Sequence, residues 1–577
     1  MSCRSRSSCT REINDGWAEN VNCCGARGTI NKKILTTHFC IRIFRAQLAS
    51  FFAMEGSTAL RVLGVPTGGG RFVAVASASV TVGASLVYLL RRRSRLMSST
   101  SSSTAEKEQV LVLRKQHFCD AVSVSYSNTN PLMIVGGSGS KLYDSDGREF
   151  LDSRNNVSHL GHQHPAVVSA VQRQVATLNT NTRYLHPNAT LLAQKLANLL
   201  PDPLEVVFLV NSGSEANDLA LRLARAATGS DNTICVDGAY HGHTLACLEV
   251  SPYKYEKSEE FDLQPQIEDL PPGYDNPITP SKKIWKVPSP CTYRGLHRGE
   301  DAAESYAEYV EEACRVYTQE RGEELGAFIV EGGMSVAGVI LPPASYLKKA
   351  VDVIRNAGGL YIADEIQTGF GRFGSCYWAF QHGWDVADPS MHVVPDIVTV
   401  GKPFGNGMPL AAVVTTREIA QAFTDCGVEL FNTFGGNPVC SAAGLAVLEA
   451  IETESLQKNA KDVGQYLMGE FKRLQKNNLD IIGDIRGSGF FVGIELVRDR
   501  RTLEPATEET SFLCTTMKEK YSVLTSIDGP NENVLVIKPP MPFSKEDVDQ
   551  LIKAFELAVT VDLADISDVS SLSKTPT

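Results

Sequence analysis

Short apolar runs alternate with amphipathic segments through the middle of the chain. Between about residues 204 and 415, runs such as VVFLV at 206–210 and LYIAD at 360–364 are bounded by glycine and polar residues. Runs of this length are typical of strands that are buried on both faces of a parallel sheet. Helical spacing follows the first run, at Ala216, Leu219, Ala220, Leu223, Ala224 and Ala227. The alternation predicts an α/β fold whose large domain has a doubly wound, mainly parallel sheet.

Shorter elements flank this region on both sides. Residues 132–152 alternate strand-like runs with Gly/Ser and Asp-Gly turns, which predicts a hairpin or meander. A helix is expected from about 165 to 178, and a long helix from the Gly-rich turn at 431–438 to about 475. Apolar runs within 482–495 and 533–540 predict strands of a smaller α+β domain.

These patterns divide the chain into an extension, two domains and a tail. The Pro-rich, charged stretch at 254–300 has little periodicity and is interpreted as a surface insertion. The end of the chain is Ser-rich and is expected to be disordered. The predicted division is an N-terminal extension at 1–105, the first part of the small domain at 106–165, the large domain at 166–455, the rest of the small domain at 456–562, and the tail at 563–577.

The N-terminal extension contains nineteen residues without a charge, FVAVASASVTVGASLVYLL at 72–90, bordered by arginines. This length suffices for one transmembrane helix, and the basic cluster after it would then place the folded body on the cytoplasmic side. The Arg-rich and Ser-rich composition equally fits a cleaved segment that targets a mitochondrion, another organelle or secretion. A buried soluble helix is a third interpretation. Met54 and Met97 are alternative starts, and Ser98 to Thr104 is a Ser/Thr linker.

Charge is unevenly distributed along the chain. The formal net charge is −11, and residues 1–97 hold 14 Lys and Arg against 4 Asp and Glu, which is +10. The remaining residues therefore carry −11 − 10 = −21, which argues against nucleic acid as a partner. The 14 cysteines include no C-x-x-C pair or zinc spacing, which fits reduced thiols. Three histidines in HLGHQHP, at 159–165, are more typical of a loop before a helix than of a metal site, so no metal is expected.

Two opposite charges come at the ends of two of the predicted strands. Asp364 ends the run LYIAD, and Lys402 closes the run DIVTVGK. Ligands of open α/β sheets bind at the carboxyl ends of the strands, so both side chains are expected to face one crevice. Since a buried lysine is costly unless it is paired, deprotonated or covalently used, the pair predicts pyridoxal phosphate. Lys402 would form the Schiff base and Asp364 would keep the pyridine nitrogen protonated. The alternative is that Asp364 caps a helix and Lys402 is a solvated loop residue.

An anion site is predicted where the run at 206–210 turns into its helix. Ser212 and Glu215 have the S-x-x-E spacing of a capping box, and free N–H groups at Gly213 and Ser214 suit a phosphate. An ordinary capped helix is the alternative. Tyr240, in a nearby Gly-rich turn, is a candidate to stack on a flat heterocycle, against the alternative of a packed loop aromatic.

Arginines are candidate ligands for an anionic substrate. Arg486 lies between the predicted C-terminal strands and would clamp a carboxylate or a phosphate, because arginine binds such groups with two parallel hydrogen bonds. The alternative is a surface ion pair. Arg294 and Arg298, in CTYRGLHRG, are further candidates.

The body from about 106 to 562 closely resembles the class III aminotransferases, which have the fold type I architecture of pyridoxal-phosphate enzymes. The motifs that carry the resemblance are NSGSEAND, AYHGHT, ADEIQTGFGRFG, GKPFGNG and NTFGGNP. It implies that Lys402 is the Schiff-base lysine and also moves the proton at the substrate carbon. It also implies that Asp364 binds the pyridine nitrogen of the cofactor, that Gly213 and Ser214 bind its phosphate, and that Tyr240 stacks on its ring. Gln367 would lie near the phenolic oxygen of that ring. Thr433 would reach the cofactor phosphate of the neighbouring subunit, which implies a homodimer with shared sites.

Within this family the chain is most similar to ethanolamine-phosphate and phosphohydroxylysine phospho-lyases, in stretches that include LDSRNNVSHLGHQHP, LNTNTRYLH and VLVIKPPM. The similarity implies elimination of phosphate from a phospho-amine, giving aldehyde, ammonia and phosphate. The alternative is an aminotransferase of the alanine–glyoxylate type, and Thr368 in IQTGFGR is the aminotransferase form. Val336 stands where many ω-aminotransferases have a glutamate that neutralises the arginine matched by Arg486, so Arg486 is expected to be free for one anionic group. A third hypothesis, a catalytically inactive, membrane-tethered interaction protein, is disfavoured by the intact Asp364 and Lys402.

Overall fold

The computed structural model describes residues 100–127, 129–255, 283–384, 388–477 and 479–566. The predicted membrane or targeting segment at 72–90, most of the predicted insertion and the last residues of the predicted tail lie outside these ranges. Within them, no helix combines the length and the apolar character that crossing a membrane requires. The first described helix, α3 (Thr100–His117), begins inside the predicted Ser/Thr linker, so part of that linker is helical.

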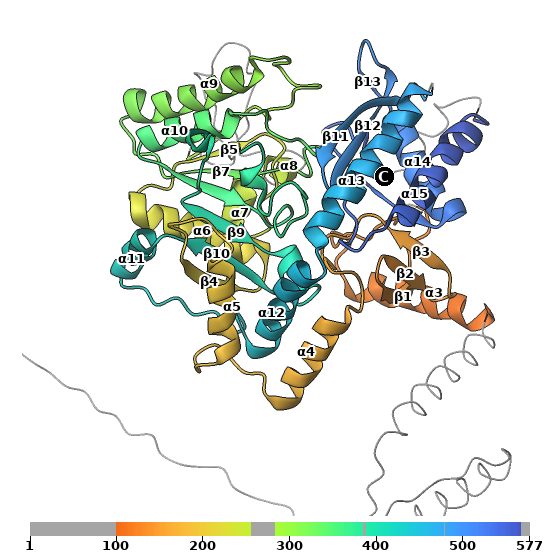
Figure 1. The fold of residues 1–577 in the computed structure, drawn as a ribbon, viewed down its shortest axis with the longest axis horizontal. Helices are drawn as coiled ribbons and strands as arrows, with labels where there is room; N and C mark the ends of the chain where they lie inside the picture. Colours follow the sequence, from red (N-terminus) through yellow and green to blue (C-terminus); the bar gives the residue numbers. More distant parts are fainter. Residues whose placement is uncertain (1–99, 128, 256–282, 385–387, 478, 567–577) are drawn as a thin grey trace, which may run out of the picture. The chain divides into compact units, whose positions relative to one another are not determined.

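Seven strands form the largest sheet (Figure 1). In spatial order they are β4 (Val206–Val210), β10 (Ala411–Thr415), β9 (Ile397–Val400), β8 (Leu360–Asp364), β7 (Ala327–Glu331), β5 (Thr233–Val236) and β6 (Ile284–Val287). The strands from β9 to β6 run parallel to one another, and β10 alone is antiparallel to both of its neighbours. The prediction of an α/β fold with a mainly parallel sheet is confirmed.

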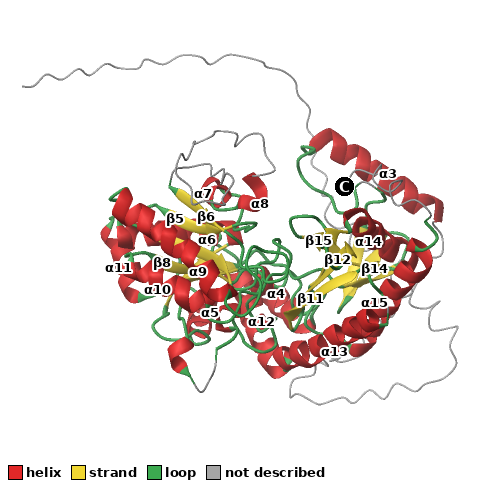
Figure 2. Cartoon of the chain, turned by 90° about the horizontal axis from the view of Figure 1, so that it is seen from above, coloured by secondary structure: helices red, strands yellow, loops and turns green. Residues whose placement is uncertain are grey.

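Both faces of this sheet are buried, and Figure 2 shows its strands enclosed by helices. Phe328 and Val330 of β7 pack into the apolar cluster that includes α9 (Ala302–Arg315) and α10 (Tyr346–Asn356). Ile329, between them, packs into the cluster on the opposite face, which includes α6 (Gly213–Thr228). Because successive side chains of a strand point to opposite faces, burial on both faces requires the continuous apolar runs seen in the sequence.

Two smaller sheets are built from the first and last parts of the described chain. One contains the predicted meander together with a strand from far along the chain, and the other is mainly a C-terminal antiparallel sheet. The first has the order β1 (Ile134–Ser138), β2 (Lys141–Asp144), β3 (Glu149–Asp152) and β14 (Val523–Leu524). The second has the order β11 (Ile482–Ser488), β12 (Phe491–Asp499), β16 (Val534–Ile537) and β15 (Ser526–Asp528), and β13 (Glu504–Pro505) pairs with β12.

The long helix expected after the turn at 431–438 is two helices, α12 (Pro438–Thr453) and α13 (Leu456–Lys476). The chain breaks at Ser455, whose φ of 53° is left-handed and cannot continue a right-handed helix. The remaining α-helices are α4 (Pro165–Thr177), α5 (Pro187–Ala197), α7 (Leu245–Glu249), α8 (Pro252–Tyr255), α11 (Arg417–Asp425), α14 (Thr507–Tyr521) and α15 (Lys545–Leu557).

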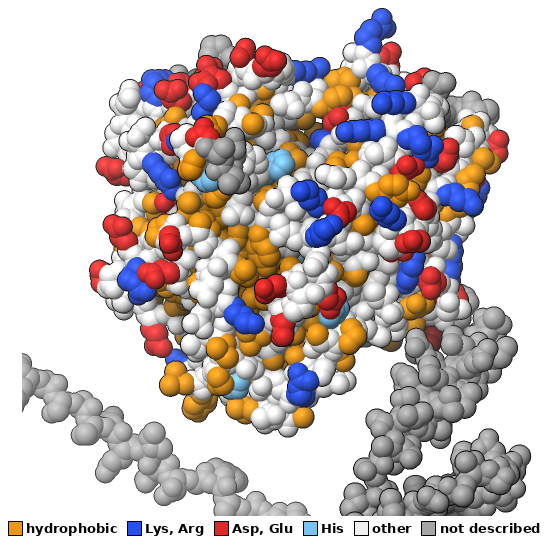
Figure 3. Space-filling model, viewed as in Figure 1, with side chains coloured by type: hydrophobic (Ala, Val, Ile, Leu, Met, Phe, Trp, Pro, Cys, Tyr) orange, Lys and Arg blue, Asp and Glu red, His pale blue; other side chains and the backbone are white. Residues whose placement is uncertain are grey.

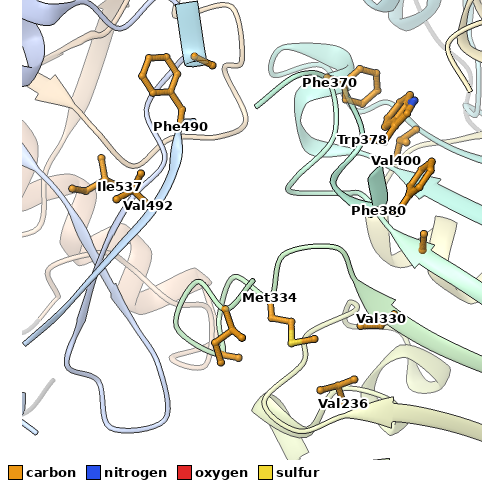
Figure 4. Close-up of a cluster of buried hydrophobic side chains, with 14 of the residues drawn as sticks. Val236, Val330, Met334, Phe370, Trp378, Phe380, Val400, Phe490, Val492 and Ile537 are labelled. Atoms are coloured by element: carbon orange, nitrogen blue, oxygen red, sulfur yellow. The ribbon is translucent and has the colours of Figure 1, made fainter. Parts of the chain in front are cut away.

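One cluster of buried side chains extends from the large sheet to the C-terminal sheet (Figure 4). It includes Val330 and Val400 of the large sheet, Phe370 in the loop after β8, and Val492 and Ile537 of β12 and β16. This shared core fixes the loops that follow β8 and β9 against the C-terminal sheet. The carboxyl ends of the central strands therefore lie at the boundary between the two sheets, where a ligand of an α/β protein is expected.

Candidate active site

Three ionisable side chains meet at the carboxyl ends of the central strands. Asp364 is the last residue of β8 and pairs in register with Glu331 of β7 and Thr399 of β9. Lys402 comes two residues after the end of β9, at the start of a short 3-10 turn. Asp364 and Glu331 are buried, whereas Lys402 is half-buried because it borders a cavity.

The cavity at this edge of the sheet has a volume of about 200 Å³. It is lined by six of the predicted site residues and by four residues without an assigned role. The six are Gly213, Ser214, Tyr240, Asp364, Gln367 and Lys402, and the four are His241, Gly242, Glu331 and Ile366. The structure therefore brings together every predicted cofactor residue except Thr433. Arg486 does not line the cavity either.

The start of α6 forms one wall of the cavity. Ser212 Oγ accepts a hydrogen bond of 3.2 Å from Glu215 N, but the Glu215 carboxylate accepts from Asn211 instead of from Ser212 N. The predicted capping box is therefore only half formed. A Cβ on Gly213 would lie 2.7 Å from Cδ1 and 3.0 Å from Cγ2 of Ile366, so a larger residue here would require Ile366 or the turn to move. Since the first N–H groups of a helix have no acceptor within it, this turn suits a phosphate.

The Asp364 carboxylate is held on both of its oxygens. Its Oδ2 accepts a hydrogen bond of 2.8 Å from Asn217 Nδ2 and lies 2.8 Å from Nδ1 of His241, while Oδ1 accepts from Ile366 N at 3.0 Å. Asn217 is itself fixed, because its Oδ1 accepts a hydrogen bond of 2.7 Å from Thr399 Oγ1. A carboxylate bound in this way keeps one orientation and presents its negative charge at the cavity wall.

Glu331 is a buried acid that sequence reasoning left without a role. Its oxygens accept hydrogen bonds from Tyr240 N at 3.3 Å and from Ser335 N at 3.1 Å. Burial raises the pKa of Glu331 to about 7, and the negative charge of Asp364 adds to the shift. A signal for this residue is present in the sequence, since Glu331 ends the apolar run AFIV, as Asp364 ends its own run.

Lys402 lines the same cavity as both carboxylates. Burial lowers the pKa of its ammonium, and the charges of Asp364, Glu331 and Asp528 oppose that shift. A lysine with a lowered pKa has a larger share of the neutral amine at a given pH, and the neutral amine is the form that attacks a carbonyl group or takes a proton.

Tyr240 and Gln367 complete the walls. Tyr240 makes an edge-to-face contact with Tyr253, with ring centroids 6.3 Å apart, and burial raises the pKa of its hydroxyl. Gln367 Oε1 accepts a hydrogen bond of 2.9 Å from Asn156 Nδ2 and lies 3.5 Å from Nζ of Lys538. Both side chains are therefore positioned by neighbours outside the cavity.

Arg486, on β11, has a guanidinium that is already engaged. Its Nη1 donates to Glu495 Oε2 at 2.7 Å and to Asp484 Oδ2 at 3.0 Å, and Nε and Nη2 both donate to the carbonyl of Gly338. Glu495 also accepts a hydrogen bond of 2.6 Å from Nε of Arg294. The expectation that Arg486 is free for an anionic group is wrong in this structure, because Glu495 and Asp484 neutralise it.

Thr433 is exposed and lies outside the cavity, next to a residue that contacts the start of α6. Asn432 donates to Glu215 Oε2 at 2.6 Å, and its backbone carbonyl accepts a hydrogen bond of 2.9 Å from Thr182 Oγ1.

The hydrogen bond between Thr182 and Asn432 joins two segments that expose large apolar side chains. This apolar patch consists of Tyr184, Leu185, Val428, Leu430, Phe431 and Phe434. Figure 3 shows apolar side chains gathered at the lower edge of one face, where Figure 1 draws α4 and α5.

The cavity fits pyridoxal phosphate. It offers a lysine for the aldehyde, a fixed carboxylate for the ring nitrogen, a glycine-containing helix start for the phosphate and an aromatic ring for stacking. The three histidines of HLGHQHP lie elsewhere and have separate partners, with His159 bound to Phe370 O and Arg372, His162 to Asp152, and His164 to Glu454. Among the described residues, no cluster of His, Cys, Asp or Glu could hold a metal ion.

Comparison with known proteins places the chain in a family. Residues 121–559 match the Aminotransferase class-III family. The chain is 44% identical to alanine–glyoxylate aminotransferase 2-like of Drosophila melanogaster, over 80% of this chain and 89% of that protein. It is 37% identical to ethanolamine-phosphate phospho-lyase homolog 1 of Caenorhabditis elegans, over 80% of this chain and 97% of that protein.

Two solved structures of similar fold also match the chain. The structure of a phospholyase from Arthrobacter in complex with phosphoethanolamine superposes with a TM-score of 0.69 at 34% identity, covering 79% of this chain and all of the other. A Bacillus anthracis aminotransferase superposes with a TM-score of 0.68 at 27% identity, covering 79% of this chain and 99% of that one. The family match covers more than half of the chain, and its members bind the cofactor that the cavity fits. The chain therefore belongs to the class III aminotransferase family and is a pyridoxal-phosphate-dependent enzyme of fold type I.

Proposed function

We propose that the protein is a phospho-lyase that removes phosphate from ethanolamine phosphate or a similar phospho-amine. Water is consumed, and the products are an aldehyde, ammonia and inorganic phosphate. The observation that carries the proposal is the engagement of Arg486 by Glu495 and Asp484. To bind the carboxylate of an amino acid or of an oxo acid, this arginine would have to give up one of these ion pairs. The likeness to the Arthrobacter phospholyase and to the Caenorhabditis elegans homolog supports the same proposal.

The residues around the cavity have distinct roles toward the cofactor in this proposal. The start of α6, at Gly213 and Ser214, would hold its phosphate, and Tyr240 would stack on its ring. Asp364, oriented by its hydrogen bonds, would keep the ring nitrogen protonated, and Gln367 would lie near the phenolic oxygen. When bound, the cofactor supplies a sink for the electron pair that is left when the substrate loses a proton.

Lys402 is the proposed catalytic base. In its neutral form, Nζ would take a proton from the substrate carbon that carries the amine. The carbon–oxygen bond to the phosphate on the next carbon then breaks, and its electron pair leaves with the phosphate. The electron pair from the lost proton forms the second carbon–carbon bond, and hydrolysis of the product yields aldehyde and ammonia. Asp364 and Glu331 oppose the lowering of the Lys402 pKa, and so set how much neutral amine is present.

A homodimer with shared sites is part of the proposal. Thr433 is exposed and follows Asn432, which contacts the start of α6, and the apolar patch of the flanking residues is a surface that a second subunit would cover. Thr433 would then reach the cofactor phosphate of the other subunit. Membrane anchoring through residues 72–90 stays a separate prediction.

An aminotransferase of the alanine–glyoxylate type is the second candidate. The Drosophila melanogaster relative supports it, as does Thr368, the aminotransferase form of the motif. However, Thr368 is buried and its Oγ1 donates to Glu365 Oε2 at 2.8 Å, and it does not line the cavity. The side chain of Thr368 therefore does not contact the reacting groups, and the residue type at this position does not favour either reaction.

The two candidates are separated by one pair of assays on the full chain purified with pyridoxal phosphate. Phosphate and acetaldehyde are measured after addition of phosphoethanolamine without any oxo acid, and pyruvate is measured after addition of alanine and glyoxylate. We expect sustained phosphate release, and we expect Lys402→Ala to abolish it together with the visible band of the bound cofactor. Pyruvate formation without phosphate release would instead establish the aminotransferase.

A further inference from the structure

Lys538 is a buried ammonium at the edge of the cofactor cavity. It follows directly after β16, and only 6% of its surface is exposed. Its Nζ donates a hydrogen bond of 2.5 Å to Ser335 Oγ and lies 3.5 Å from Oε1 of Gln367, which lines the cavity. Ser335 N in turn binds Glu331, another residue of the cavity wall. Lys538 therefore lies one side chain away from the space that the cofactor and substrate would fill.

Lys538 has few hydrogen-bond and ion-pair partners for a buried ammonium group. An ammonium group has three hydrogens to donate, but within the described ranges Nζ makes one short hydrogen bond, to a neutral hydroxyl. The nearest carboxylate oxygen, Oδ2 of Asp528, is 3.8 Å away, which is an ion-pair distance but not a hydrogen bond. Burial lowers the pKa of Lys538 to about 8, and the charge of Asp528 opposes that shift. An anion placed near Nζ would supply the partners that this ammonium lacks.

Arg486 shows the opposite situation. It donates to two carboxylates and to a backbone carbonyl, and one of those carboxylates also binds Arg294. Binding of a substrate anion to Arg486 would require one of these bonds to break, whereas binding to Lys538 would break none. Of the two cations, Lys538 is thus the better prepared for an anionic ligand.

We infer that Lys538 binds the anionic group of the substrate, and that for a phospho-amine this group is the departing phosphate. The inference rests on the proposed function for the identity of the anion. As the carbon–oxygen bond breaks, its electron pair leaves with the phosphate, so negative charge increases on the group nearest to Nζ. An ammonium held at that place stabilises the charge in the transition state more than in the bound substrate.

The test compares two amines that differ only in the phosphate. The visible spectrum of the full-length holoenzyme is titrated with phosphoethanolamine and with ethanolamine, for the wild type, Lys538→Met and the exposed control Lys545→Met. We expect Lys538→Met to weaken phosphoethanolamine binding by about tenfold to a hundredfold, because a charged hydrogen bond is lost, and to leave ethanolamine binding unchanged. Lys545→Met should change neither. Equal weakening of both amines, no change in either, or no effect of phosphoethanolamine on the wild-type spectrum would overturn the inference.

A second variant covers the case in which Lys538→Met does not fold. Asp528→Asn removes the carboxylate that lies 3.8 Å from Nζ, so it should strengthen phosphoethanolamine binding relative to ethanolamine binding. A lower ratio of the two affinities would count against Lys538 as the anion ligand. Phosphate release is measured in parallel. If the affinity ratio changes but no phosphate is released, Lys538 is an anion ligand and the phospho-lyase proposal fails. If phosphate is released but the affinity ratios are unchanged, the phospho-lyase proposal stands and Lys538 is not the anion ligand.

Discussion

Nδ1 of His241 lies 2.8 Å from Oδ2 of Asp364, at the end of the strand on which the cavity is built. Asn217 donates to the same oxygen, and Ile366 N binds the other one. Because a carboxylate only accepts hydrogen bonds, the His241 ring must carry a hydrogen on Nδ1 to make this contact. Residues from α6, from the turn before α7 (Leu245–Glu249) and from the loop after β8 thus converge on one acid, and they fix its orientation before any ligand binds.

Replacement of this acid by its amide should retain the shape of the site and remove its charge. We expect Asp364→Asn to fold and to bind the cofactor, but to lower kcat by about a hundredfold to a thousandfold, as for other losses of a preorganised charge. The measurement is phosphate release from phosphoethanolamine, with the visible spectrum as a check on cofactor content. Asp352→Asn, on the exposed side of α10, is the matched control and should be neutral. Full activity of Asp364→Asn would show that the ring nitrogen needs no carboxylate.

At the start of α6, Gly213 lies close to the side chain of Ile366. Gly213→Ala would place its Cβ 2.7 Å from Cδ1 and 3.0 Å from Cγ2 of Ile366, so the turn or the isoleucine must move. We expect weaker cofactor binding, measured as the concentration of pyridoxal phosphate that restores half of the activity to the stripped enzyme.

Gly469→Ala is the control for the alanine itself. Gly469 is an exposed residue of α13, and a Cβ there meets nothing within 4 Å. This variant should bind the cofactor normally and gain up to about 1 kcal/mol of stability from the helix propensity of alanine. If both variants bind the cofactor equally well, the close approach at Gly213 has no bearing on the phosphate site.

The residues that sequence patterns located are those whose position follows from one local element. Asp364 and Lys402 end apolar runs, and Gly213 and Ser214 begin a helix, so the ends of the elements were sufficient. The strands of the large sheet were also predictable from the sequence, because burial on both faces gives each of them a continuous apolar run. In contrast, the break at Ser455 was missed because serine does not mark a left-handed residue and the polar stretch around it, at 452–455, contains neither glycine nor proline.

The residues that were missed depend on contacts between distant segments. Asn217 and His241 lie in recognised motifs, but their common partner is 147 and 123 residues away. Lys538 meets Ser335 across 203 residues, and the engagement of Arg486 depends on the register between β11 and β12. Sequence spacing alone does not give such pairings, because they are set by the order of the strands and by the packing of the two sheets.

Stability should depend on pH through Glu365, which is fully buried and directly follows Asp364 in the chain. Burial raises the pKa of Glu365 to about 7 from an ordinary value of 4.5, although Phe380 N and Thr368 Oγ1 both donate to it. A raised pKa means that the folded state binds the proton more tightly than the unfolded chain. Its contribution to stability is thus complete below about pH 4.5 and is lost as the pH rises through 7.

Glu365→Gln should remove this dependence. Relative to the wild type, the free energy of unfolding of the variant should increase between pH 5 and pH 8 by up to about 3 kcal/mol. Urea denaturation of both holoenzymes at several pH values gives this difference, and other titrating groups cancel because they are common to both. A difference that stays constant across this range would mean that Glu365 titrates at its ordinary pKa in the folded protein.

Mixed dimers test whether each active site draws on two subunits. Lys402→Ala removes the proposed base of its own site and leaves Thr433 intact, whereas Thr433→Asp would place a negative charge beside the partner's cofactor phosphate and block that site. Each variant alone should be inactive. When the two are co-expressed, half of the dimers are mixed and each has one site with both wild-type residues, so about a quarter of the wild-type activity per subunit should return. Activity of Thr433→Asp alone would remove Thr433 from the phosphate site, and inactive mixed dimers would show that each subunit's site depends on its own Thr433.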